Sequence, residues 1–440
     1  MSPVSAAFAG TRPSGRPGGR PDGCAPVVEH TGRGPTGYEV TFRFRAPEAE
    51  RVQIKGEWFF ARPADLPQLA GTADAPTVEG QGLLPEEWQP GDVPLQHPNA
   101  TSPNWPVADM RRRGDGVWTY TTPLPPGVFT YGFFVDSRAE DQSDVPQVFD
   151  PANPPWTVGP DEDQPRVQTS QVYVPSDPAF DTVDRSWQAP RDERGTLEHV
   201  THPSPGHLTP ADENYAVVYT PAGYDPERAR PYPTLYLAHG GGENELGWST
   251  QGALADIVDN LIDEGTIEPL VVVMPNATGF PDSTANAAYR ADLIGTLIPW
   301  VEARYNVSPD PERRAFSGLS MGGMLTNLLM LHDTEEFGYY GMMSAGLPPG
   351  TTLSEAQVDA LRKVSVFVGS GWQDVIHHAG YGSVHTGPAR EVDLLTRAGV
   401  HVTTDFVNGG HEWFVWRTLL RDFLTRVAFL PLPFAPAEEP

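Results

Sequence analysis

The sequence GLSMG at 318–322 places Ser320 between two glycines, at a point where the local pattern changes. The segment RRAFSG at 313–318, which we expect to be a strand, precedes Ser320. A helical pattern follows at 321–333. A strand–turn–helix of this kind holds a serine hydroxyl above the edge of a sheet, beside a helix N-terminus that favours negative charge. We therefore predict that Ser320 is a nucleophile. The alternative is a glycine-rich turn that only packs a helix against a sheet.

A serine hydroxyl becomes a strong nucleophile only when a base takes its proton and a carboxylate orients that base. Asp374 and His411 suit these roles, because each follows an expected strand, at 363–371 and at 402–407. Neighbouring parallel strands end at the same edge of a sheet, so we expect both side chains near Ser320. Weaker candidates are Asp405 and Glu412 for the acid, and His377, His378 and His385 for the base.

The oxyanion of a tetrahedral intermediate needs two backbone N–H donors. One donor is expected at Met321, directly after the predicted nucleophile. The other is expected in the glycine run after the strand PTLYLA, with Gly241 favoured and Gly240 as the second choice. The alternative for this run is a flexible turn. His239, just before it, is interpreted as a structural residue that holds the loop rather than as a second base.

Three tryptophans, Trp248, Trp372 and Trp413, fall on the same loops as these residues. We interpret them as an apolar pocket that binds the acyl or aryl part of a substrate. Because Trp372 and Trp413 flank the expected acid and base, packing against those two residues is an equally good interpretation.

Two patterns divide the chain. Short alternating strands separated by turn residues predict an immunoglobulin-like β-sandwich over 37–175, with a long Pro-rich loop at 62–108. Strands alternating with helices predict an α/β domain with a doubly wound, mostly parallel sheet over 196–440. The head at 1–36 is expected to be disordered, and 176–195 is expected to be a linker.

The charge and cysteine content exclude several classes of function. Asp and Glu number 57 against 30 Lys and Arg, so the formal net charge is −27. Such a chain lacks the basic face that nucleic acids and anionic membranes require. Cys24 is the only cysteine in the sequence, which excludes an intramolecular disulfide and a cysteine-rich metal centre. With no phosphate-binding or zinc motif, we expect neither a cofactor nor a metal.

The sequence shows no signal for membrane insertion or export. No apolar run is long enough to span a membrane, and the first residues lack the apolar core of a signal peptide. The expected location is therefore the cytoplasm, and an intracellular substrate is favoured.

Seven stretches of the second half resemble the esterase family that groups enterochelin (siderophore) esterases with feruloyl and acetylxylan esterases, within the α/β-hydrolases. In chain order they are VVYTPAGYD, YPTLYLAHGGGENELGW, IEPLVVVMPN, LIPWVEARYNV, RRAFSGLSMGG, VFVGSGWQD and NGGHEWFVWR. The resemblance implies an α/β-hydrolase fold, with Ser320 as nucleophile, Asp374 as acid and His411 as base. It agrees with the interpretation of the residues themselves at each position.

The first half is similar to the E-set (early immunoglobulin-like) module that precedes this catalytic domain in many relatives. The matching stretches are VQIKGEW, DGVWTYTTPLPPGVFTYGFFVD and DPAN. Such modules resemble the N-terminal domains of glycogen-branching enzymes, which implies carbohydrate binding. The alternative that we favour is packing against the catalytic domain, where the module shapes the rim of the pocket.

The function expected from these features is that of a serine carboxylic-ester hydrolase, which forms an acyl-enzyme on a siderophore-type or other small ester. One alternative is an acyltransferase similar to mycolyltransferases, and another is a feruloyl or acetylxylan esterase that acts on carbohydrate esters. A carbohydrate-binding protein with an inert hydrolase half is a third. The expected partner is a small-molecule or glycan ester, not a nucleic acid or a membrane, and the sequence indicates no oligomeric state.

Overall fold

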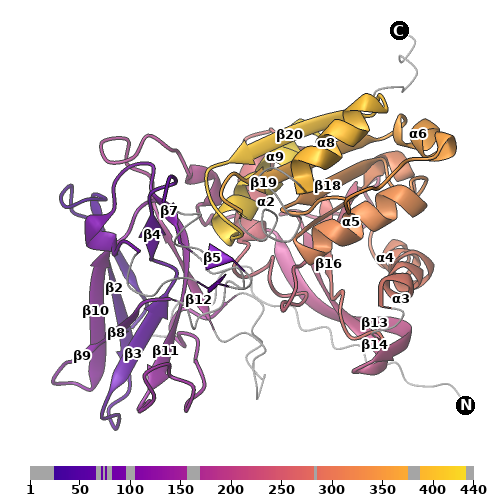
Figure 1. Cartoon of the computed structure of the whole chain (residues 1–440). Helices are drawn as coiled ribbons and strands as arrows, with labels where there is room; N and C mark the ends of the chain where they lie inside the picture. The colour runs from indigo at the N-terminus through magenta and orange to yellow at the C-terminus, as the bar shows by residue number, and fades with distance from the viewer. Residues whose placement is uncertain are drawn as a thin grey trace, which may run out of the picture.

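The computed structural model describes residues 24–65, 71–72, 75–76, 82–95, 105–155, 169–281, 285–374 and 387–432. Within these residues the chain forms two lobes that lie side by side (Figure 1). The first lobe, up to residue 174, is rich in strands, and in the second, from residue 196, helices cover a large sheet. No helix in the described part of the chain combines the length and the apolar character that crossing a membrane requires.

Two four-stranded antiparallel sheets build the β-rich lobe, with the orders β1-β2-β10-β9 and β12-β11-β3-β8. The bounds are β1 Val27–His30, β2 Tyr38–Arg45, β3 Val52–Gly56, β8 Val107–Asp109, β9 Arg111–Arg112, β10 Val117–Pro123, β11 Gly127–Val135 and β12 Ser170–Val174. Two short ribbons pair β4 Phe60–Ala61 with β7 Val93–Pro94, and β5 Gly71–Thr72 with β6 Ala75–Pro76. Val40 and Phe42 of the first sheet share one apolar core with Ile54 and Phe133 of the second.

Among the strands that lie in segments expected to lack regular structure, two belong to the four-stranded sheets. β1 lies in the expected disordered head, but it pairs with β2 along its whole length; residues 1–23 lie outside the described residues. β8 lies in the expected loop at 62–108 and pairs with β3. Both are short, largely exposed edge strands, so they lack the alternation of apolar residues that identifies a strand in a sequence.

An eight-stranded sheet forms the centre of the second lobe, with the order β13-β14-β16-β15-β17-β18-β19-β20. Its bounds are β13 Thr196–Leu208, β14 Ala211–Thr220, β15 Thr234–Ala238, β16 Val271–Pro275, β17 Arg314–Leu319, β18 Tyr339–Met343, β19 Ser365–Gly371 and β20 His401–Val407. β14 pairs antiparallel with β13 and β16, and the remaining pairs are parallel. The α/β prediction with a mostly parallel sheet is therefore confirmed.

Helices cover both faces of this sheet. α2 and α9 share one apolar core with one face, and the remaining helices share a second core with the other face. The bounds are α2 Leu254–Asp263, α3 Ala285–Asp292, the π-helix η4 Leu293–Leu297, α4 Ile298–Glu302, α5 Met321–His332, α6 Glu355–Leu361, α8 Gly387–Arg397 and α9 Trp413–Arg426. Because the parallel strands run in one direction, the loops after them meet at a single edge of the sheet.

Two of the differences between this lobe and the prediction involve proline. β13 was not predicted, because Pro203 and Pro205 interrupt its pattern; it is an edge strand, where the missing N–H of proline breaks no ladder. A single helix was expected at 291–305, but the structure has three segments, α3, η4 and α4. Pro299 is the second residue of α4, and its lack of an N–H is consistent with the irregular turn before it.

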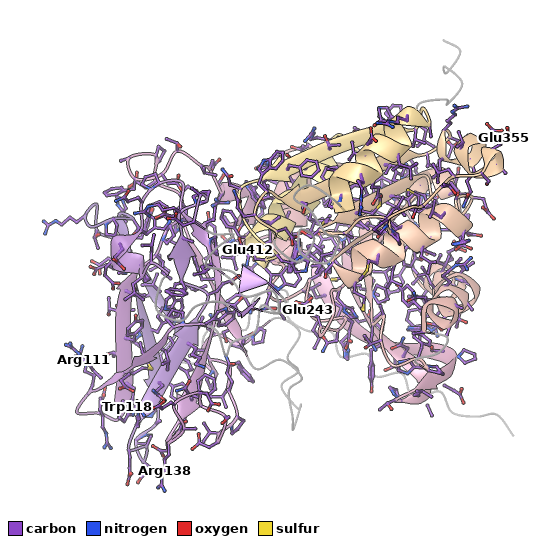
Figure 2. All side chains as sticks on the ribbon, in the orientation of Figure 1. Arg111, Trp118, Arg138, Glu243, Glu355 and Glu412 are labelled. Carbon is purple, nitrogen blue, oxygen red and sulfur yellow. The ribbon has the colours of Figure 1, made fainter. Side chains whose placement is uncertain are left out.

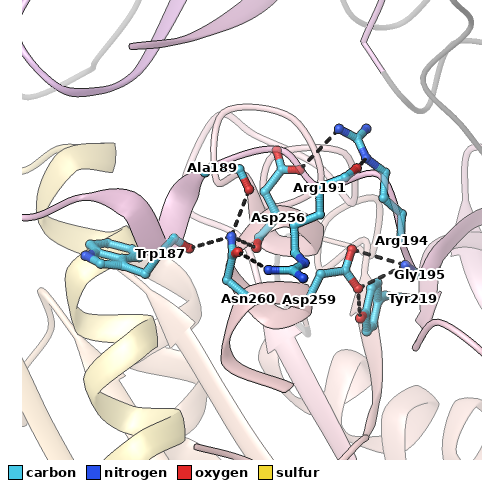
Figure 3. A network of polar contacts seen from close by, with 9 residues as sticks. All are labelled: Trp187, Ala189, Arg191, Arg194, Gly195, Tyr219, Asp256, Asp259 and Asn260. Atoms are coloured by element: carbon cyan, nitrogen blue, oxygen red, sulfur yellow. Dashed lines mark hydrogen bonds and ion pairs between the residues drawn. The ribbon is translucent and has the colours of Figure 1, made fainter. Parts of the chain in front are cut away.

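The connection between the lobes, which was expected to be a linker over 176–195, is hydrogen-bonded to α2 (Figure 3). The side-chain amide of Asn260 donates to the carbonyl oxygens of Trp187 and Ala189, at 3.2 and 2.8 Å. The carboxylate of Asp259 accepts the N–H of Gly195 at 2.9 Å. These bonds hold the connection against the second lobe.

Candidate active site

The turn between β17 and α5 holds Ser320 in a conformation that few residues adopt, with φ 51° and ψ −114°. Its N–H donates to the carbonyl oxygen of Met343 in β18 at 2.8 Å, which anchors the turn. A Cβ on Gly318 would lie 2.6 Å from the carbonyl carbon of Gly322, and a Cβ on Gly322 would lie 2.6 Å from the carbonyl oxygen of Ala238. Only glycine fits at both positions, as a sharp strand-to-helix turn around a serine requires.

Asp374 and His411 meet where β19 and β20 end. The Nδ1 of His411 lies 2.9 Å from the Oδ2 of Asp374, and their exposed fractions are 7% and 0%. A Cβ on Gly371 would lie 2.2 Å from the carbonyl oxygen of Gly409, so the glycines let the two loops approach each other. Ser320 emerges at the same edge because β17 runs parallel to β19, and only β18 lies between these two strands. The structure thus joins the predicted acid and base by a hydrogen bond and places the predicted nucleophile at their edge of the sheet.

The other candidate acids contact different groups. Asp405 lies within β20 and pairs with Arg426 of α9 at 3.8 Å. Burial, together with the neighbouring Asp422 carboxyl, raises the pKa of Asp405 to about 7. The Oε1 of Glu412 accepts the N–H of Gly410 at 3.2 Å. The remaining candidates for the base, His377, His378 and His385, lie outside the described residues.

The glycine run that follows β15 offers one backbone donor and uses another. The N–H of Gly240 donates to the Oε2 of Glu243 at 3.3 Å, so it is engaged within the loop. No hydrogen bond among the described residues uses the N–H of Gly241 or of Met321. These are the two donors that the sequence predicted for an oxyanion.

His239 fixes the start of this loop through both of its ring nitrogens. Its Nδ1 donates to the carbonyl oxygen of Gly240 at 2.7 Å, and its Nε2 accepts the N–H of Ala277 at 3.0 Å. A ring that donates at Nδ1 and accepts at Nε2 is neutral. These contacts fit the interpretation of His239 as a structural residue.

Glu243 also lies near Ser320, and it was not among the residues predicted for the site. Its Oε2 and the Cβ of Ser320 each lie 3.6 Å from the point where a Cβ on Gly240 would stand. Burial raises the pKa of Glu243 to about 7. Figure 2 shows Glu243 and Glu412 where the two lobes meet. The sequence does contain one sign that Glu243 belongs to the site, because it directly follows the glycine run in which an oxyanion donor was expected.

The three tryptophans occupy different environments. Trp248 and Trp413 have exposed fractions of 0% and 1%, and their rings pack edge to face at 5.1 Å. The Nε1 of Trp413 donates to the Oε1 of Gln251 at 2.8 Å. Trp372 is 48% exposed and lies 5.1 Å from the ring of Phe406. Of the three, only Trp372 presents a large surface that a ligand can reach.

Comparison with known proteins relates the second lobe of the chain to an esterase family. Residues 211–427 match a family model described as "Putative esterase". The chain is 30% identical over 327 residues to the endo-1,4-beta-xylanase/feruloyl esterase of Xylanibacter ruminicola, an alignment that covers 71% of this chain and 40% of that protein. It is 37% identical over 138 residues to endo-1,4-beta-xylanase Y of Acetivibrio thermocellus, covering 29% of this chain and 12% of that protein. The chain thus spans less than half the length of either relative.

A solved structure is similar over both lobes. The enterobactin esterase of Shigella flexneri, in the presence of 2,3-dihydroxy-N-benzoyl-glycine, matches with a TM-score of 0.51 and 16% sequence identity. The match covers 92% of this chain and 96% of that one, so it shows a shared fold: an α/β-hydrolase-like lobe preceded by a β-rich lobe. Through residues 211–427, the chain thus resembles the esterase family of that model.

Proposed function

We propose that the chain is a serine carboxylic-ester hydrolase in which Ser320, His411 and Asp374 form a catalytic triad. The observation that carries this proposal is the 2.9 Å contact between His411 and Asp374, at the sheet edge that also holds Ser320. A serine on a strained turn, at the same sheet edge as an imidazole oriented by a buried carboxylate, is suited to acyl transfer. The family match supports the same class of reaction.

The first half of the reaction forms an acyl-enzyme. Because a carboxylate can only accept a hydrogen bond, the Nδ1 of His411 donates to Asp374 and the Nε2 is the basic nitrogen. The Oγ of Ser320 attacks the ester carbonyl carbon while this Nε2 takes its proton. The buried Asp374 carboxylate stabilises the imidazolium that forms. As the tetrahedral intermediate collapses, the imidazolium returns the proton to the leaving alcohol, and the acyl group stays on Ser320.

The second half releases the acid. Water attacks the acyl carbon, His411 takes one proton from that water, and the carbon–Oγ bond breaks as the proton returns to Ser320. In both tetrahedral intermediates, the negative oxygen accepts hydrogen bonds from the N–H groups of Gly241 and Met321. Such donors lower the barrier because they are already in place when the charge develops.

For the substrate we propose a small ester that carries an aromatic ring, of the siderophore type or a feruloyl ester. The exposed ring of Trp372, two residues before Asp374, offers a flat apolar surface for such a ring. One relative is named as a feruloyl esterase, and a protein of the same fold is named as an enterobactin esterase. Trp248 and Trp413 support the loops from within the core.

A panel of methyl esters tests this proposal: acetate, butyrate, ferulate and a dihydroxybenzoyl-serine ester, each given to wild type and to Ser320→Ala. We expect wild type to hydrolyse at least one ring-bearing ester with a higher kcat/KM than the butyrate, and Ser320→Ala to hydrolyse none. Folded wild type that cleaves no ester would contradict the proposed activity. Cleavage of the aliphatic esters alone would contradict only the substrate class.

For the domain organisation we propose an immunoglobulin-like module over 37–175, extended at its start by β1, and a catalytic domain over 196–440. The two antiparallel sheets with one shared core support the first assignment. Limited proteolysis with mass spectrometry checks the boundaries, since cuts should fall outside both ranges. A cut between β17 and β20 that precedes all others would contradict the second.

A further inference from the structure

Three ionisable side chains are buried together where the β-rich lobe meets the loop that carries His411. Glu57 directly follows β3, whereas Arg417 lies in α9 and Glu412 directly precedes α9. Their exposed fractions are 3%, 2% and 0% in that order. Figure 2 shows Glu412 at the junction of the lobes. Charges so far from water must compensate one another, because an unpaired buried charge is strongly destabilising.

Arg417 links the two lobes. Its Nη1 donates to the carbonyl oxygen of Val128 in β11 at 2.9 Å, and its Nε donates to the carbonyl oxygen of Gln251 at 2.9 Å. Its Nη2 lies 3.6 Å from the Oε2 of Glu57. That same oxygen accepts the N–H of Thr130 at 3.1 Å. The first lobe therefore supplies both a carbonyl oxygen and a carboxylate to a guanidinium of the second.

Glu412 connects this cluster to the histidine loop. Its Oε1 accepts the N–H of Gly410, the residue before His411, at 3.2 Å. Its Oε2 has no hydrogen-bond partner, and neither does the Nη2 of Arg417, among the described residues. Burial, with the Glu57 carboxylate nearby, raises the pKa of Glu412 well above its ordinary value. With Glu412 protonated, the guanidinium of Arg417 and the carboxylate of Glu57 remain as an oppositely charged pair.

We propose that Glu57 is a positioning residue of the active site, through which the β-rich lobe keeps Arg417 paired and Glu412 uncharged beside His411. This inference rests on the proposed triad. It gives the first lobe an electrostatic function in catalysis that requires no contact with substrate.

Replacing Glu57 by a neutral residue is expected to change the charge of Glu412. The guanidinium of Arg417 would then be buried without an anion, and Glu412 is the other carboxyl that it attracts. Ionisation of Glu412 would restore neutrality, since a nearby positive charge favours the charged form of a carboxyl. A carboxylate next to His411 stabilises the imidazolium, so the base would need a higher pH to lose its proton.

The other ionisable groups around His411 are present in every variant of this comparison. Asp374 accepts from His411 itself, and Glu243 interacts with it from the loop after β15. Arg185 faces Glu412 from the connection between the lobes. Because these groups are present in every variant, a shift of the acid limb that disappears when Glu412 is also replaced reports the charge of Glu412.

The test is the pH dependence of kcat/KM for p-nitrophenyl acetate, measured on the full chain. Glu57→Gln is expected to move the midpoint of the acid limb upward by about half a pH unit or more. Glu412→Gln is expected to leave the midpoint at the wild-type value, and the double variant is expected to return to it. Glu39→Gln, at an exposed position of β2 in the same lobe, is the matched control and leaves the midpoint unchanged.

An unchanged midpoint in Glu57→Gln, or a shift that persists in the double variant, overturns the inference. If Glu57→Gln does not fold, the midpoint of the acid limb in Glu412→Gln is the test by itself. An unchanged midpoint then supports the inference, and a downward shift overturns it, because it means that Glu412 is ionised in wild type. Failure of the triad itself is recognised separately, as wild type in which a fluorophosphonate does not react with Ser320.

Discussion

The Nδ1 of His411 lies 2.9 Å from the Oδ2 of Asp374, and this contact joins two residues 37 positions apart in the chain. Both side chains are buried, so water competes little for the bond. A carboxylate in this place holds the imidazole in one orientation and one tautomer, and it stabilises the imidazolium formed when the serine is acylated. We therefore expect that replacing the carboxylate of Asp374 impairs catalysis.

Asp374→Asn is expected to lower kcat by about 10³- to 10⁴-fold with little change in KM, because the amide keeps the shape of the side chain but favours the wrong tautomer. Steady-state kinetics with p-nitrophenyl acetate, together with a thermal unfolding curve, measure this. Asp405→Asn is the matched control, since Asp405 pairs with Arg426 instead, and it keeps the wild-type kcat. Comparable kcat values in the two variants would argue against Asp374 as the orienting acid.

The donor role of Gly241 is tested by removing its N–H. Gly241→Pro is expected to lower kcat by about 10²- to 10³-fold, the range seen when one oxyanion donor is lost. Gly241→Ala keeps the N–H, and its Cβ would meet no atom within 4 Å, so its kcat stays close to wild type. If both variants have the same kcat, the donor lies elsewhere.

The tryptophans differ in exposure, and they should differ in what their loss affects. Trp372→Ala is expected to raise KM for methyl ferulate about 2- to 13-fold without changing KM for methyl butyrate or the melting temperature, because stacking on one ring contributes about 0.5–1.5 kcal/mol. Trp413→Ala is expected to lower the free energy of unfolding by about 3–5 kcal/mol, as loss of a buried aromatic side chain does. Kinetics and denaturant unfolding measure the two effects. An equal rise in KM for both esters in Trp372→Ala would contradict the proposed aromatic contact.

Glu391 of α8 is a fully buried acid that the proposed mechanism does not use. Its Oε2 accepts the side-chain amide of Asn327 and the N–H of Leu347, each at 3.0 Å. Its Oε1 has no hydrogen-bond partner among the described residues. Burial raises the pKa of Glu391 from 4.5 to about 8. The folded protein therefore keeps this proton at pH values where the unfolded chain has lost it.

This retained proton makes stability depend on pH. Between pH 4.5 and about 8 the folded state binds more protons than the unfolded state at Glu391, so its contribution to stability falls as the pH rises. Glu391→Gln removes this dependence. We expect its melting temperature to exceed that of wild type at about pH 8, and the gap to narrow toward about pH 5. Thermal unfolding at both pH values measures this, and a gap that does not vary with pH would contradict the assignment.

The positions of Ser320, Asp374 and His411 could be predicted because they depend on local features. A glycine-flanked serine between a strand and a helix specifies a sharp turn, and residues that follow buried strands must emerge at the end of the sheet. The parallel strands alone predict that these residues share one edge, whereas the strand order, in which only β18 separates β17 from β19, comes from the structure. Glycines at the loop contact, such as Gly371 and Gly409, were visible in the sequence as well.

The features that could not be predicted depend on contacts between distant parts of the chain. Glu57 and Arg417 lie in different lobes, and no local pattern indicates that they pair. The direction of a loop tryptophan is set by tertiary packing, so Trp248 and Trp372 looked alike in sequence but differ in exposure. β13 was missed because its prolines are tolerated only at an edge, and the sequence does not show where the edge lies.

The most direct test of the account is covalent labelling of the folded protein with a fluorophosphonate, followed by peptide mass spectrometry. We predict a single adduct on the Oγ of Ser320, lost in Ser320→Ala and strongly reduced in His411→Ala, because the probe reacts with a serine only when a base activates it. An adduct on another residue, or no adduct on folded wild-type protein, would contradict the central claim.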